Sequence, residues 1–215
     1  MQCDDKHVNK STYSNMVIHQ DNLTFSVIND KEVKVLHLYP RTSDITRLVI
    51  PPHVQGYRVS VIAKKAFYEC TKLRHVTLPQ YLRSIEDEAF GLCDKLEEIY
   101  LPDRITHIGK GAFEGTLALQ KVVLPRNLTA LPEALFYDSA VSDVTLPDNI
   151  TEIPSACFYD CRNLRRIVLP ATVTSVAPDA FHYCMNLEEV VAPKSIDHIE
   201  MFDGEKKSVL KVKRL

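Results

Sequence analysis

The sequence predicts a repeat solenoid, a β-rich stack of about six coils of 23 residues with parallel strands, short helical turns and a cap at each end. Two periodic sets of residues support this prediction. A fixed period of this size is typical of solenoids, in which each coil buries its apolar face only against its neighbours. The phenylalanines are spaced by 23, 23, 23, 22 and 23 residues, and the prolines keep the same period: Phe67, Phe90, Phe113, Phe136, Phe158 and Phe181, with Pro79, Pro102, Pro125, Pro147, Pro170 and Pro193.

The N-terminal residues come before the repeat. Residues 1–16 are polar and aperiodic, and we expect them to be a mobile tail. Residues 23–28 and 33–38 alternate apolar and polar side chains around Asn29-Asp30, a pattern typical of a hairpin. We expect this capping hairpin, within residues 17–44, to cover the first open sheet edge of a solenoid that spans 45–199.

Each coil contains three segments. A phrase such as Leu96-x-x-Ile99-x-Leu101 predicts a short strand, and the proline that follows ends its pairing because it has no N–H to donate. A second apolar pair, such as Ile105 and Ile108, returns the chain to the core on the opposite wall. A small residue before the phenylalanine, such as Ala112, predicts a short helical turn there.

Two irregularities and a closing segment complete the pattern. The first coil carries five extra residues around 55–58, and a later coil lacks one residue between Phe136 and Val141. Residues 200–215 are expected to form a C-terminal cap, with Asp203-Gly204 as a turn and 208–212 as a closing strand. Its basic residues would protect the open edge: Lys206, Lys207, Lys211, Lys213 and Arg214.

Composition excludes several classes of function. A net charge of −2 gives no bulk attraction to nucleic acid, and the absence of an 18-residue apolar run predicts no membrane insertion. The first residues lack the apolar core of a signal peptide. We therefore expect either a cytoplasmic protein or a secreted or cell-surface protein whose leader or anchor is missing from this form, and in either case a monomer.

The cysteines favour packing over chemistry. Cys70, Cys93, Cys161 and Cys184 share one position of the repeat, three residues after the phenylalanine, where other coils carry threonine or serine. Such a position favours a small, weakly polar, buried side chain, although disulfides and a metal site are alternatives. No Cys-x-x-Cys pair occurs and the histidines do not cluster, so we expect no metal and no cofactor. Cys157 occupies the alanine position as core filler.

The outward-facing side of the strand stack is the candidate binding surface. One column of alternating charge runs through Arg47, His75, Glu98, Lys121, Asp143, Arg166 and Glu189. The next column is a stripe of β-branched and aromatic side chains, which we expect to be exposed: Val49, Thr77, Tyr100, Val123, Thr145, Val168 and Val191.

Two interpretations of these columns remain open. The charges could only neutralise one another, and the stripe could reflect strand propensity alone. An apolar stripe flanked by charge is also typical of a partner site. The binding hypothesis selects Tyr100 as the anchor, flanked by six side chains: Val123, Val168, Lys121, Arg166, Glu98 and Asp143.

The repeated phrase Ala-Phe-x-x-Cys-x-x-Leu-x-x-Ile-x-Leu-Pro-x-x-Ile-x-x-Ile resembles the BspA-like, or Treponema pallidum-type, leucine-rich repeat. The resemblance runs from about Ile45 to Ile199, and the preceding hairpin and Ile50-Pro-Pro-x-Val-x-Gly-Tyr-x-Val59 phrase also look like the usual entry to that family. It implies a leucine-rich-repeat solenoid without catalytic residues. It also implies adhesion and protein binding, commonly at the cell surface.

The sequence therefore favours a non-catalytic module that binds a protein or surface ligand of unknown identity through its strand face. A structural spacer or scaffold with no ligand on that face is the alternative. No glycine-rich phosphate loop and no trio of nucleophile, base and orienting group can be recognised, so we do not expect an enzyme.

Overall fold

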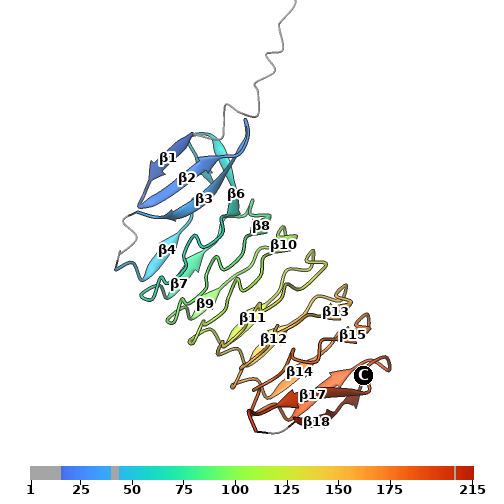
Figure 1. Cartoon of the computed structure of the whole chain (residues 1–215). Helices are drawn as coiled ribbons and strands as arrows, with labels where there is room; N and C mark the ends of the chain where they lie inside the picture. The colour runs from blue at the N-terminus through green and yellow to red at the C-terminus, as the bar shows by residue number, and fades with distance from the viewer. Residues whose placement is uncertain (1–15, 40–43, 206) are drawn as a thin grey trace, which may run out of the picture.

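A computed structural model describes residues 16–39, 44–205 and 207–215, and shows a β-solenoid of about eight turns (Figure 1). The predicted leucine-rich-repeat architecture is confirmed, but the predicted number of coils was too small. The additional turns come from the first coil, which precedes Phe67, and from the last strand, which follows the repeat. Residues 1–15 of the predicted tail, and Lys206 of the predicted cap, lie outside the described residues.

One face of the solenoid, the first strand wall, holds one strand from each turn. Neighbouring strands are parallel and in register, so that Arg47 lies opposite His75 and Lys121 opposite Asp143. The wall is divided into three sheets, with breaks between β9 and β11 and between β12 and β14. The strands are β4 (Arg47–Val49), β7 (His75–Thr77), β9 (Glu98–Ile99), β11 (Lys121–Val123), β12 (Asp143–Thr145), β14 (Arg166–Val168), β16 (Glu189–Ala192) and β19 (Lys213–Arg214).

The opposite face, the second strand wall, is formed where the chain returns after each proline. Its apolar pairs point into the core as predicted, and Ile105 and Ile108 are both buried. This wall is also divided, because β10 does not pair with β13. The strands are β6 (Tyr57–Ile62), β8 (Ser84–Ile85), β10 (His107–Ile108), β13 (Glu152–Ile153) and β15 (Ser175–Val176).

The N-terminal strands extend the second wall. The strands β1 (Val17–Gln20), β2 (Leu23–Val27) and β3 (Glu32–Leu38) form an antiparallel meander, and β3 pairs in parallel with β6. The five extra residues of the first coil make a hairpin between β5 (His53–Val54) and β6. Gln55 and Gly56 form its turn with φ values of 48° and 87°, as a two-residue type I′ turn requires.

The C-terminal residues close the stack with a hairpin and a further strand. The strand β17 (His198–Phe202) pairs antiparallel with β18 (Lys207–Lys211), and β19 then adds a parallel strand beside β16. Ion pairs anchor this end, since Arg214 Nη2 lies 2.9 Å from Asp197 Oδ1 and Lys213 Nζ lies 3.8 Å from Glu189 Oε1.

The third face, the turn wall, contains the segments around each core phenylalanine, and it corrects one prediction. None of the described residues is helical. The residues two before and two after each phenylalanine, except Asp179 before Phe181, have a left-handed backbone with φ from 50° to 62°, which interrupts any helix. They are Lys65, Glu88, Gly111, Ala134 and Ala156 before the ring, and Glu69, Leu92, Gly115, Asp138, Asp160 and Tyr183 after it.

This backbone directs the turn wall's hydrogen bonds between coils instead of along a helix. The amides of Glu88, Phe90 and Leu92 donate to carbonyl oxygens of the next coil at 2.8, 3.0 and 2.8 Å. The same three bonds repeat in the coils of Phe67, Phe113 and Phe136, and two of them, from Phe158 and Asp160, continue the ladder to the coil of Phe181. The turn wall is therefore a continuous ladder, whereas both strand walls are broken.

The six phenylalanine rings stack inside this ladder and form the centre of the core. All six are fully buried, and successive ring centroids lie 5.1, 5.7, 5.9, 5.8 and 5.3 Å apart. These distances lie in the range of favourable stacked aromatic pairs. The missing residue after Phe136 does not disturb the stack, because the shortened corner lies after the ring.

The in-phase cysteines tie each coil to the one before it. The Sγ–H groups of Cys93, Cys161 and Cys184 donate to the carbonyl oxygens of Phe67, Phe136 and Phe158 at 3.1, 3.0 and 2.9 Å. All three side chains are fully buried, as the packing interpretation predicted, and Cys70 is half-buried. Burial raises the pKa of the Cys161 thiol to about 12 and raises that of Cys93 and Cys184 further.

We expect Phe113→Ala to lower the free energy of unfolding by about 3–5 kcal/mol, because it leaves a cavity between two stacked rings. Urea unfolding followed by circular dichroism measures the change, with the exposed Thr106→Ala as the control. A midpoint equal to that of the wild type would show that the phenylalanine stack does not stabilise the coils.

We expect Ala134→Gly to raise the free energy of unfolding by up to about 1 kcal/mol, because glycine removes the cost of a left-handed alanine. The matched change Ala112→Gly, in a fully buried alanine without a left-handed backbone, should lower it by about 1 kcal/mol. Thermal unfolding of both variants tests the pair, and a loss of stability in both would contradict the role given to the turn backbone.

We expect the thiols of Cys93, Cys157, Cys161 and Cys184 to resist iodoacetamide in the native protein at pH 8 and to react fully in guanidinium chloride. Burial excludes the reagent, and the raised pKa values keep the thiols protonated. The raised pKa of Cys161 also links its protonation to stability. The stability that the buried neutral thiol contributes is fully present below pH 9, the pKa of the thiol in the unfolded chain, and is lost as the pH rises through the folded pKa of about 12. Peptide mass mapping gives the answer, and rapid native alkylation at these positions would contradict it.

Candidate functional site

The charged column of the first strand wall forms ion pairs where its strands are paired. Lys121 Nζ lies 3.2 Å from Asp143 Oδ2, and Arg166 Nε donates to Glu189 Oε1 at 3.1 Å. Each pair joins residues directly opposite in the parallel register. These side chains are at least one third exposed, so each pair contributes at most about 1 kcal/mol.

The charge ladder fails at the break between β9 and β11. Glu98 and Lys121 are consecutive in the column, but among the described residues they form no ion pair with each other, and Lys121 binds Asp143 instead. The Glu98 side chain is 83% exposed, and its only described ionic contact is His75 Nδ1 at 3.9 Å. A carboxylate is therefore available to a partner at this break.

A groove of about 800 Å³, the strand-wall groove, lies across the same break. Val76 and Ile99 form its floor with their inner, largely buried side chains. Tyr100 and Val123 line it with 78% and 54% of their surface exposed, and both point away from the core. Arg47 also lines the groove and has no ion pair among the described residues.

The second break, between β12 and β14, carries a smaller hollow of about 330 Å³. Asp143, Thr145, Arg166 and Val168 line it, and Val168 is 39% exposed. Where the strands separate, the surface between them is therefore hollowed in both cases.

These two hollows divide the residues that the sequence analysis selected. Glu98, Tyr100, Lys121 and Val123 lie together in the strand-wall groove. Asp143, Arg166 and Val168 lie in the smaller hollow. The selection omitted the three other ionisable residues that line the strand-wall groove: Arg47, His75 and Glu97. Arg47 and His75 belonged to the charged column of the sequence. Glu97 could have been found from its opposite charge to Arg74, which lies one period earlier and donates a hydrogen bond to it in the structure.

One member of the stripe was placed wrongly. Val191 was expected to be exposed, but only 8% of its surface is accessible. It lies on β16 directly opposite Lys213 of β19, so the C-terminal strand continues the wall beside it. Val49, at the other end of the stripe, is 67% exposed.

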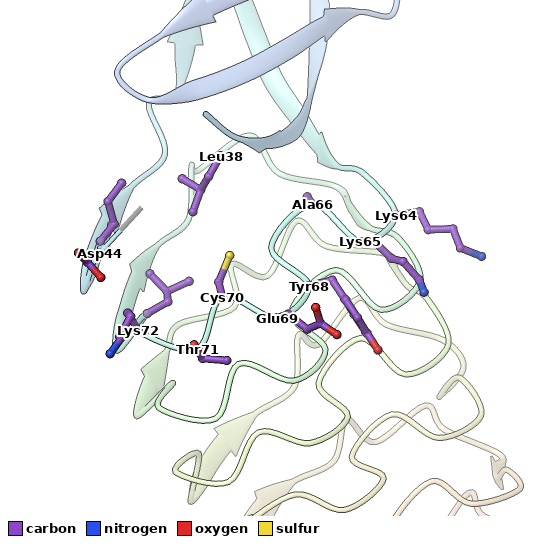
Figure 2. A pocket seen from close by; sticks show the side chains of 12 residues that line it. Leu38, Asp44, Lys64, Lys65, Ala66, Tyr68, Glu69, Cys70, Thr71 and Lys72 are labelled. Atoms are coloured by element: carbon purple, nitrogen blue, oxygen red, sulfur yellow. The ribbon is translucent and has the colours of Figure 1, made fainter. Parts of the chain in front are cut away.

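A further hollow of about 580 Å³ lies between the N-terminal strands and the first turn of the turn wall (Figure 2). Two of its lysines already have carboxylate partners, since Lys64 Nζ lies 3.3 Å from Asp87 and Lys65 Nζ lies 2.9 Å from Glu88. Leu38 and Asp44 in its lining flank residues 40–43, which are outside the described part of the chain. The strand-wall groove is therefore the better candidate.

Within residues 16–39, 44–205 and 207–215, no three His, Cys, Asp or Glu side chains are arranged to hold a metal ion. Nor does that part of the chain contain a helix long and apolar enough to cross a bilayer.

Solved structures of bacterial leucine-rich-repeat proteins share the fold. A leucine rich cell surface protein from Faecalibacterium prausnitzii is 25% identical, with a TM-score of 0.71 over 87% of this chain. The chain spans only 57% of that protein's length. A leucine-rich-repeat protein of T. pallidum is 26% identical, with a TM-score of 0.64, and the match covers 77% of this chain and 88% of that one. A search among curated proteins finds no match.

The family described as BspA type leucine rich repeat region matches in six copies, over residues 39–153 and 84–204. These ranges include every core phenylalanine and both hollows of the first strand wall. The chain therefore belongs to the family of BspA-type leucine-rich-repeat proteins.

Proposed function

We propose that this chain is a non-catalytic binding module that holds a protein partner in the strand-wall groove, with Tyr100 as the anchor. One observation carries the proposal. At the break between β9 and β11, a highly exposed tyrosine lies beside charges that the ladder does not cancel. On the paired strands β11 and β12, and on β14 and β16, opposite charges lie together instead.

The chemistry of the groove suits a protein surface. An aromatic side chain that becomes buried in an interface carries a large share of the binding energy, and Tyr100 has most of its surface available. Val123 enlarges the apolar contact. The charged groups of Glu98, Lys121, Asp143 and Arg166 would mainly orient the partner and raise the rate of encounter.

The related structures support an adhesive role at the cell surface. The similar protein from F. prausnitzii is described as a cell surface protein, and the family match covers most of this chain. Adhesion requires a wide, accessible face more than an enclosed cavity, and the strand-wall groove is open along the first strand wall.

A structural spacer is the second candidate, and the ion pairs of the first strand wall favour it. Lys121 with Asp143 and Arg166 with Glu189 neutralise one another, as a surface without a ligand would require. The two candidates differ in the consequence of changing the groove, since a spacer would tolerate the change.

We expect the double change Tyr100→Ala and Val123→Lys to weaken partner capture at least tenfold, or by about 1.4 kcal/mol, while folding is retained. Both side chains point to solvent, so the core is untouched. Crosslinking capture from host or target-cell extract, quantified by mass spectrometry, compares the variant with the wild type, and circular dichroism verifies folding.

The matched control is Tyr39→Ala with Val17→Lys, which makes the same two changes at exposed positions outside the groove lining, one directly after β3 and one in β1. It should capture the partner as well as the wild type does. Equal capture by the groove variant would reject the groove as the binding site and favour the spacer.

A further inference from the structure

The turn wall carries a second surface with its own chemistry, at the position that directly follows each core phenylalanine. The side chains at this position lie outside the buried ring stack and change along the solenoid from Tyr68, Gly91 and Glu114 to Tyr137, Tyr159 and His182. The three tyrosines at equivalent positions allow a comparison within one molecule.

The first of these tyrosines holds a cation supplied by the chain itself. Lys65 Nζ lies 4.5 Å from the centroid of the Tyr68 ring, and Glu88 Oε2 holds the same ammonium group at 2.9 Å. Figure 2 shows Lys65 beside Tyr68. Lys65 is the left-handed residue two before the phenylalanine, with φ 56°, so its place in the repeat is well defined. An ammonium group over a tyrosine face is attracted by the ring quadrupole.

The later tyrosines lack this internal cation. The residue equivalent to Lys65 is Ala134 in the coil of Tyr137 and Ala156 in the coil of Tyr159, with the same left-handed backbone. In the part of the chain that the structure describes, cations lie over the rings of Tyr68 and Tyr81 and over neither Tyr137 nor Tyr159. Tyr137 and Tyr159 therefore have the same position in the repeat as Tyr68 but no lysine from their own coil.

These rings form one cluster, the tyrosine patch, consisting of Tyr137, Asp138, Tyr159, Asp160 and Tyr183. The Tyr137 and Tyr159 rings stack with centroids 4.9 Å apart at 9°, and Tyr183 lies 5.0 Å from Tyr159 on the other side. One face of Tyr137 is thus covered by Tyr159, and the side chain is 40% exposed. The preceding coil has Glu114 at the same position, so that coil offers no ring to stack on the other face of Tyr137.

The carboxylates of the patch are incompletely neutralised. Arg162 binds Asp160 through two hydrogen bonds of 2.6 and 3.1 Å. Asp138, one coil earlier, has no ion pair among the described residues. Partial burial raises the pKa of Asp138, and the neighbouring Asp160 raises it further. A cation placed here would relieve Asp138.

We propose that the tyrosine patch binds a basic segment of another protein, with a lysine or arginine cation over the face of Tyr137 that Tyr159 leaves uncovered, as Lys65 lies over Tyr68. Asp138 supplies the negative charge that Glu88 supplies in the earlier coil. An apolar partner fits less well, because it would bury Asp138 without a compensating charge. This surface lies on the turn wall, so its binding is independent of the strand-wall groove.

Comparison of the coils suggests a variant in which the chain's own lysine occupies the proposed cation site. Ala134→Lys places a lysine three residues before Tyr137, the same spacing and the same backbone region as Lys65 and Tyr68. We expect this lysine to occupy the ring and to weaken binding of an external cation at least tenfold. Ala134→Gln, of similar length and uncharged, should leave binding unchanged. Thr151→Lys adds the same charge at an exposed position before β13 and should also have little effect.

The probe is a fluorescein-labelled peptide with three lysines separated by glycine and serine, and its lysine-acetylated form is the control. Fluorescence anisotropy at physiological salt measures binding, with circular dichroism to verify folding. We expect the lysine peptide alone to bind the wild type, and Tyr137→Leu to weaken it as Ala134→Lys does. Failure of the peptide to bind the wild type would overturn the proposal. So would undiminished binding to Ala134→Lys, or an equal loss with Thr151→Lys, which would indicate unspecific attraction to the acidic surface.

Discussion

The continuous turn wall, with the phenylalanine stack behind it, is the constraint on which the rest of the solenoid depends. Each ring is in register with the next because the amides on either side of it donate to the following coil. This arrangement requires left-handed residues in every coil, and most of them are not glycine. Each non-glycine residue in this conformation costs about 1–2 kcal/mol. Burial of the rings and the hydrogen bonds between coils of the turn wall offset this cost, because both require the same backbone geometry.

This constraint leaves the strand walls free to separate locally. The first strand wall breaks twice, and both breaks carry a hollow lined by outward-facing side chains. Separation of the strands also separates the charges that would otherwise pair, as Glu98 and Lys121 show. The features that make the wall a candidate interface therefore follow from its incomplete hydrogen bonding, and the turn wall holds the coils together at the same points.

A repeat also permits comparison of equivalent positions within one chain. Tyr68 and Tyr137 occupy the same position and the same backbone, but only Tyr68 has a lysine from its own coil. One difference is Lys65 against Ala134, and it leaves the Tyr137 ring without a cation from its own coil. The charged ladder of the first strand wall gives the same kind of contrast between paired and separated strands.

The sequence by itself determined the solenoid, the buried phenylalanine column, the inward apolar pairs of both walls and the small buried position of Cys93 and Cys161. These features depend on period and side-chain character, which a repeat makes visible many times. It also selected Tyr100 and Val123, which the structure places together in one groove. The predicted helical turns were wrong because a left-handed backbone at residues such as Glu88 and Leu92 has no signature when the residue is not glycine. Only the tertiary structure decided where the strand walls break and that β19 continues the wall beside Val191. These outcomes depend on the spacing between coils and on contacts distant in sequence, which the period of a single coil does not encode.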